Sequence, residues 1–182
     1  MKRLSTTLAI LLVAAFAVSP ILVQAQMGAP KEKSEVAKLI EAAMASNIRT
    51  ADERARDAKE RKPVETLEFF GLQPNMTVVE LMPSGGWYTK ILAPVLAEKG
   101  KLIVAVGAAR LAPKLLEWKL DKVEAQDGKF EFRPSGQYGV GEIDAMESPI
   151  TGADMVLTFR NMHNFTPTAR ARINATVIGM LK

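Results

Sequence analysis

The chain has 182 residues and no cysteine, and its 24 basic and 20 acidic residues give a formal charge of +4. The lack of cysteine excludes disulfides, thiol catalysis and cysteine-ligated zinc. Leaving out Lys2 and Arg3, which belong to the leader described next, lowers the charge from +4 to +2, which is too small an excess to indicate a nucleic-acid-binding surface.

The first residues have the pattern of a secretory signal peptide. Lys2 and Arg3 precede an apolar run over residues 8–23, and Val23-Gln24-Ala25 has the small residues of a cleavage site. An uncleaved membrane anchor is the less favoured alternative, because the run is shorter than the ~20 residues of a spanning helix. We therefore expect residues 1–25 to be removed, leaving a periplasmic or secreted protein without a stable membrane anchor.

Two helical segments are expected before the first strand. Apolar residues recur at helical spacing over residues 34–48, which predicts an amphipathic helix. A strongly charged stretch follows over residues 49–62. Pro63 suits the first turn of a second helix, which Gly71 ends. We assign residues 26–62 to a helical extension and residues 63–182 to a separate domain.

From residue 76 onward, strands alternate with helices. Strands are expected at residues 76–82, 101–106, 129–133 and 154–159, and helices at residues 87–98, 111–123 and 167–182, with Pro113 in the first turn of the second of these helices. This alternation predicts an α/β domain with right-handed crossovers and a parallel sheet. Residues 134–149 contain three glycines and no clear periodicity, so we expect a long loop that binds or covers a ligand.

The segment from Thr77 to Thr89 carries the strongest functional signal. An apolar run containing Glu80 leads to Pro83-Ser84-Gly85-Gly86, and helix-forming residues begin with Trp87 and Tyr88. In open α/β sheets, the glycine turn after the first strand binds adenosine-containing cofactors. Two glycines are too few for the G-x-G-x-x-G fingerprint of dinucleotide-binding proteins, so a nicotinamide-dependent oxidoreductase is disfavoured.

This motif resembles the first motif of class I S-adenosylmethionine (SAM) methyltransferases. Over residues 50–182 the chain more narrowly resembles a family of exported bacterial methyltransferase-like proteins. The resemblance implies a Rossmann-like parallel sheet with helices on both faces, and SAM as the cofactor. The elements that carry it are Arg61-Lys62-Pro63, Phe69-Phe70-Gly71, Gly85-Gly86-Trp87-Tyr88-Thr89, Ile91-Leu92-Ala93-Pro94 and Phe159-Arg160-Asn161-Met162-His163-Asn164.

The usual strand order of that fold makes the first and fourth strands neighbours. Residues 83–87 and 160–163 would then form the two lips of one crevice. Trp87 and Tyr88 either pack on the ligand or belong to the core, and Arg61 either reaches a ligand carboxylate or forms an exposed ion pair. The expected cofactor-binding residues are Glu80, which would accept a hydrogen bond from the ligand ammonium, and Pro83, Ser84, Gly85, Gly86, Trp87, Tyr88 and Arg160.

His163 is the only histidine of the chain and the expected catalytic base, because imidazole accepts protons near neutral pH. The alternative is a structural role in its loop. Asn161 is expected to orient His163, and Asn164 to cap the helix that follows Thr166. One histidine without a nearby carboxylate pair lacks the ligands that zinc or iron requires, so no metal is expected.

Three features depart from the family's pattern. Residues 105–110, after the second strand, include no acid to hold the ribose hydroxyls of SAM. Export removes the chain from the cytoplasm, where SAM is made. The sequence ends after four strands, whereas class I methyltransferases have seven, so we expect a fragment, with a naturally short protein as the alternative. The resemblance implies transfer of a methyl group from SAM to a small-molecule or envelope acceptor, and this is the first hypothesis. The first two departures support the second, a non-catalytic periplasmic binding protein that keeps the fold.

Overall fold

The structure, a computed structural model, describes residues 32–182, of which Lys33–Lys182 form one compact unit. The predicted signal peptide, residues 1–25, lies outside the described residues. Within the described part, no helix has the length and apolar character needed to cross a membrane.

The centre of the unit is a four-stranded sheet in which every pairing is parallel. It consists of β1 (Thr77–Leu81), β2 (Lys101–Ala105), β3 (Glu124–Ala125) and β6 (Met155–Leu157), in the order β3-β2-β1-β6. In this register, Glu80 of β1 lies between Val104 of β2 and Leu157 of β6. The predicted parallel sheet, with its first and fourth strands adjacent, is confirmed.

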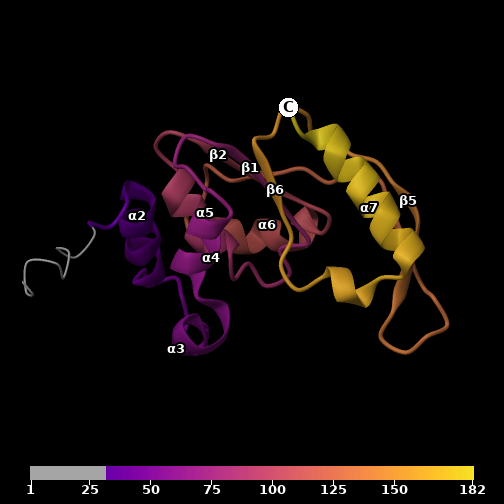
Figure 1. Ribbon diagram of the computed structural model, residues 1–182, viewed down its shortest axis with the longest axis horizontal. Helices are drawn as coiled ribbons and strands as arrows, with labels where there is room; N and C mark the ends of the chain where they lie inside the picture. Colours follow the sequence, from indigo (N-terminus) through magenta and orange to yellow (C-terminus); the bar gives the residue numbers. More distant parts are fainter. Residues whose placement is uncertain (1–31) are drawn as a thin grey trace, which may run out of the picture. The chain divides into compact units, whose positions relative to one another are not determined.

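Both faces of β1 are buried, as its apolar run predicts. Val78 packs with α2 (Glu35–Met44), α4 (Pro63–Phe69) and α5 (Thr89–Leu96), whereas Val79 packs with α7 (Pro167–Met180) and a hairpin strand. Neighbouring residues of a strand point to opposite faces, so the two cores lie on opposite sides of the sheet. Figure 1 shows α2 and α5 on one side and α7 on the other.

The predicted third strand is wrong in its place and its pairing. The third strand of the sheet is β3, and residues 129–133 instead contribute to β4 (Phe130–Pro134), which pairs antiparallel with β5 (Gly141–Met146) in a separate two-stranded sheet. The predicted long loop over residues 134–149 is wrong as well, because it contains β5. Ile143 and Met146 of β5 are buried in the core beneath α7.

The helix predicted at residues 111–123 begins earlier, as α6 (Ala108–Glu117), and Pro113 therefore lies in its interior. The reason is a capping carboxylate that is distant in sequence. Asp127 accepts hydrogen bonds from the backbone N–H groups of Gly107, Ala108 and Ala109 at 2.9, 3.0 and 2.9 Å. Such capping satisfies donors that a helix N-terminus leaves free.

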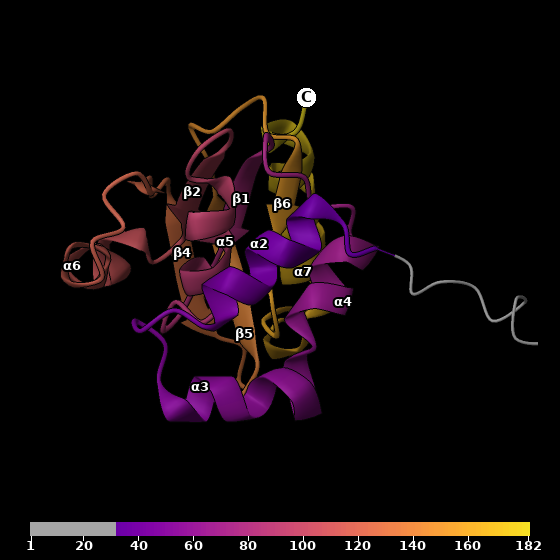
Figure 2. The same cartoon turned by 90° about the vertical axis from the view of Figure 1, so that its left-hand side faces the viewer.

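The charged stretch over residues 49–62 is also ordered. It forms α3 (Ala51–Arg56), whose capping box joins Thr50 and Glu53, and a short π-helix, η1 (Asp57–Arg61). Figure 2 shows α3 lying across one end of the sheet.

Candidate functional site

A crevice of about 440 Å³ lies at the carboxyl ends of β1 and β6. Three segments line it: part of residues 50–61 from α3 and η1, part of residues 80–88 from β1 and the glycine loop, and residues 159–161 after β6. Its volume is within the range of small-molecule sites. The predicted meeting of the glycine loop with the segment after the fourth strand is confirmed.

The structure places most of the predicted site residues in the wall of this crevice, but not all of them. Gly86 and His163 do not line it. The wall formed by α3 and η1 was missed, although the Thr50-x-x-Glu53 capping box marks the start of a helix there. The predicted residues in the wall are Glu80, Pro83, Ser84, Gly85, Trp87, Tyr88, Arg160 and Asn161.

The two glycines of the loop are needed for different reasons. Gly86 has a left-handed backbone (φ +77°), and a Cβ there would lie 2.8 Å from the Trp118 ring. Position 86 therefore requires a glycine both for its backbone conformation and for packing. Gly85 has no described atom within 4 Å of its would-be Cβ, and it lines the crevice. Only Gly85 is placed where a missing side chain leaves room for a ligand.

Glu80 is buried at the floor of the crevice, with 3% of its surface exposed. It accepts a hydrogen bond from the Thr89 hydroxyl at 2.6 Å. Burial raises the pKa of Glu80 from its ordinary value of 4.5 to about 8, because desolvation outweighs the Thr89 hydrogen bond. Glu80 is therefore mostly protonated at neutral pH, and a cationic group beside it would favour ionisation.

Trp87 lies between two guanidinium groups. Those of Arg49 and Arg61 each lie 4.8 Å from the centroid of its ring. Arg49 is held by Asp57, with nitrogen–oxygen distances of 2.7 and 2.8 Å. Arg61 forms no ion pair with any described residue, so the exposed ion pair considered for it is not present.

Two N–H donors of the crevice wall are buried without an acceptor. They are Nε of Arg61 and Nε1 of Trp87, neither of which has a hydrogen-bond partner among the described residues. A buried donor left unpaired costs about 1–3 kcal/mol. A ligand oxygen that came within hydrogen-bond distance of either donor, once the wall side chains had moved to uncover it, would remove this cost.

Tyr88 belongs both to the core and to the crevice wall. Its ring stacks on Phe159, with centroids 3.5 Å apart and planes 12° apart. Burial raises the pKa of the Tyr88 hydroxyl, and the neighbouring Arg61 guanidinium opposes that rise. The aromatic pair therefore joins the glycine loop to the segment after β6.

Asn161 also joins these two loops. Its side-chain amide donates hydrogen bonds to the Met82 carbonyl (3.3 Å) and to the Thr158 hydroxyl (2.9 Å). No bond to His163 is found for this amide within residues 32–182, so Asn161 acts on the loop rather than on the imidazole. Arg160 is exposed on the rim, with a left-handed backbone (φ +61°).

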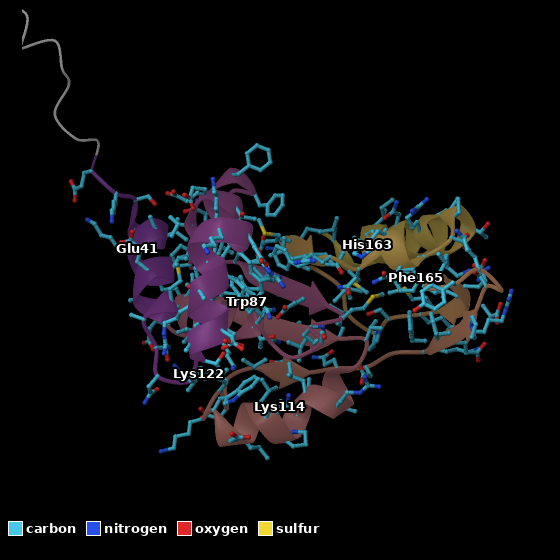
Figure 3. The ribbon with its side chains drawn as sticks, turned by 90° about the horizontal axis from the view of Figure 1, so that it is seen from below. Glu41, Trp87, Lys114, Lys122, His163 and Phe165 are labelled. Atoms are coloured by element: carbon cyan, nitrogen blue, oxygen red, sulfur yellow. The ribbon has the colours of Figure 1, made fainter. Side chains whose placement is uncertain are left out.

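His163 lies outside the crevice. It is exposed in the short 3-10 helix η2 (Met162–Asn164). In Figure 3, His163 and Phe165 lie beside α7, apart from Trp87. The capping role predicted for Asn164 is wrong, because the Thr166 hydroxyl accepts the hydrogen bond from the Ala169 N–H group at 3.1 Å.

Carboxylates near the crevice come from an unexpected element. Asp127 follows β3 in the chain, and its carboxylate is used to cap α6 after the end of β2. Burial raises the pKa of Asp127, but backbone hydrogen bonds from Ala109, Ala108 and Gly107 outweigh burial and hold the pKa below its ordinary value. Asp52 and Glu53, from the start of α3, line the crevice instead. Among residues 32–182, no cluster of three or more acidic or histidine side chains could hold a metal ion.

No protein-family model matches the chain, and no curated protein sequence does. Among solved structures, the chain is similar to a SAM-dependent methyltransferase from Aquifex aeolicus, with a TM-score of 0.54 and 16% sequence identity. The similarity covers 82% of this chain and 69% of that one. It shows the fold: the domain has a Rossmann-like parallel sheet of the methyltransferase type, as the sequence predicts.

Proposed function

We propose that the crevice binds SAM or a closely related amino-acid-bearing nucleoside, and that the protein is a SAM-dependent methyltransferase-like protein. The methyl acceptor would be a small molecule or a component of the cell envelope. The observation that carries this proposal is that residues lining the crevice carry buried N–H donors without acceptors, on Arg61 and Trp87, together with the acids Glu80 and Asp52. Such a wall suits a ligand with both a carboxylate and a cationic group.

The residues fit the amino-acid end of SAM in a specific way. The ligand carboxylate would accept hydrogen bonds from Arg61 Nε and Trp87 Nε1. The ligand ammonium would lie toward Glu80 and ionise it. Asp52, whose carboxylate has no partner among the described residues, would offer a further acceptor. Gly85 would leave space for the nucleoside against the loop backbone.

When bound, SAM supplies an activated methyl group. The chain would contribute mainly by positioning the acceptor in line with that group. Tyr88, Phe159 and Asn161 hold the two loops of the crevice together. His163 is kept as the proposed base, and because it lies outside the crevice the acceptor that it deprotonates would bind at the rim, on the side of the segment after β6.

The second candidate is a non-catalytic periplasmic binding protein that keeps the fold. It is favoured by the position of His163, which lies outside the crevice. Among the described residues, the wall of the crevice includes no histidine, lysine or cysteine. The proposed export rests on the leader pattern of residues 1–25.

The test is calorimetric titration of SAM, and of decarboxylated SAM, into the mature protein beginning at Gln26. We expect micromolar binding of SAM. The change Arg61→Ala should weaken SAM binding about tenfold, the effect of losing a charge-assisted hydrogen bond, and leave decarboxylated SAM unaffected. Turnover of an acceptor would separate the enzyme from the binding protein.

Two variants act as controls. Gly85→Asp places a side chain in the crevice and should abolish binding, whereas Leu116→Ala, on the exposed face of α6, should not. Absence of heat with both SAM and its demethylated product would exclude SAM as the ligand.

A further inference from the structure

A second hollow lies between the β4–β5 hairpin and the start of α7. We name it the hairpin groove; it has a volume of about 770 Å³ and is lined by Phe132, the hairpin turn from Pro134 to Gly141, Asn164 and Phe165. Figure 1 shows β5 beside α7. None of the described residues lines both the hairpin groove and the crevice, although Asn161 and Asn164 are only three residues apart.

The lining of the hairpin groove is aromatic and uncharged. Phe132 and Phe165 form an edge-to-face pair with centroids 6.3 Å apart. Phe132 is 56% exposed and Tyr138 is fully exposed, so apolar ring surface faces water. No acidic or basic side chain of the described residues lines this groove, whereas the crevice wall holds both kinds. Covering such rings with an aromatic ligand would be favourable.

The shape of the hairpin groove depends on glycines of the hairpin. Gly136 and Gly139 have left-handed backbones (φ +88° and +72°). A Cβ on Gly141 would overlap the Phe132 ring, so the ring lies directly against the turn. A side chain at Gly141 would therefore displace the Phe132 ring, whereas one at Gly136 or Gly139 would strain the backbone without meeting other atoms.

The hairpin groove also offers free hydrogen-bonding groups. The side-chain amides of Gln137 and Asn164 line it and form no hydrogen bond within residues 32–182. Each amide can donate to and accept from a ligand. Two such amides on an aromatic wall would orient a ring that carries one polar substituent.

We propose that the hairpin groove binds a planar, uncharged aromatic small molecule with a hydroxyl or carbonyl group. The volume suits such a ligand, the rings of Phe132 and Phe165 contact it, and Gln137 or Asn164 bonds its polar group. A charged ligand would find no counter-ion there. This site does not depend on SAM binding in the crevice.

The test is a titration of the isotope-labelled mature protein with 2-naphthol, followed by amide NMR. Saturable shifts are expected at Gly136, Gly139 and Gly141. Phe132→Ala, and the double change of Gln137→Ala with Asn164→Ala, should each weaken binding about tenfold, with the remaining spectrum showing that the fold is intact. Leu116→Ala, which removes a still more exposed apolar side chain from α6, should change nothing.

The charged analogue 2-naphthoate should bind about tenfold more weakly than 2-naphthol, because it has no counter-ion in the groove. Equal affinity for the two probes would overturn the proposal. So would the absence of shifts at the three glycines, or shifts confined to the amides of Gly85 and Gly86 in the crevice.

Discussion

Among single residues, Glu80 links the protonation of the crevice to the stability of the fold. Its pKa is about 8 in the folded protein and 4.5 ordinarily, so the folded state binds the proton more tightly than the unfolded state. The stabilisation of the folded state by this proton is complete below about pH 4.5 and is lost as the pH rises through 8. The slope is at most about 1.4 kcal/mol per pH unit.

The prediction is that Glu80→Gln, which imitates the protonated carboxyl, removes this dependence. Urea denaturation at pH 5, 6.5 and 8.5 should show the variant close to the wild type at pH 5 and more stable at pH 8.5. The difference between the free energies of unfolding of the two proteins at each pH cancels the titration of all other groups. A difference that does not change with pH would mean that Glu80 is ionised in the folded protein.

The neighbouring glycines Gly85 and Gly86 provide a matched pair of substitutions. Gly86→Ala should lower the free energy of unfolding by about 1–3 kcal/mol, because it combines a left-handed backbone with a contact at 2.8 Å to Trp118. Gly85→Ala meets no described atom within 4 Å and should change stability by under about 0.5 kcal/mol. Thermal denaturation of both variants checks this, and equal losses would contradict the assigned roles.

At the scale of elements, buried ion pairs hold the wall formed by α3 and η1 in place. The Arg49–Asp57 pair is almost fully buried, and Lys90 of α5 lies 3.1 Å from both carboxylate oxygens of Glu53. Arg49 also contacts the Trp87 ring. These contacts connect the charged segment to the glycine loop and to α5, so the segment is part of the crevice and not only a solvated helix surface.

Breaking the buried pair should therefore loosen this wall. Asp57→Leu leaves the buried charge of Arg49 without its carboxylate partner and should cost about 3–5 kcal/mol in urea denaturation. The double variant Arg49→Met with Asp57→Leu should recover most of that loss, because two apolar side chains replace the pair. The exposed Lys122–Glu98 pair is the control, and Glu98→Leu should cost less than about 1 kcal/mol.

The sequence predicted the elements whose signals are local. The apolar run of β1, the glycine loop and the Thr166-Pro167 start of α7 are each contained in a few neighbouring residues, and all three were found. The position of the crevice followed from strand order, which a βα alternation restricts to few choices.

Two of the misses depend on contacts between distant residues. The strand β3 has only two residues, and it is defined by its pairing with Ile103 and Val104 of β2. So short a strand has no hydrophobic pattern that the sequence could show. Asp127 moves the start of α6 from a position 18–20 residues away. By contrast, the strand β5 did have a local signal, since its first four residues, Gly-Glu-Ile-Asp, alternate between buried and more exposed positions.

At the scale of the whole molecule, the two sheets form two hollows of opposite character. The crevice is charged and lies where the parallel strands end, the usual ligand position for open α/β sheets. The hairpin groove is uncharged and is built by the β4–β5 insertion against α7. The structural similarity to the Aquifex aeolicus methyltransferase, at 16% identity, shows the fold alone, so the ligands of both hollows must be argued from their own residues.

Because the two hollows have separate linings, their ligands should stabilise the fold independently. A ligand that binds only the folded state adds about 2.7 kcal/mol at ~100 times its dissociation constant. We expect SAM and 2-naphthol together to raise the free energy of unfolding by the sum of their separate effects, as urea denaturation would measure. Gly85→Asp should remove only the SAM contribution and Phe132→Ala only that of naphthol. A combined effect no larger than the greater single one would show that both ligands occupy one site, or that the segment from Asn161 to Asn164 allows only one to be filled.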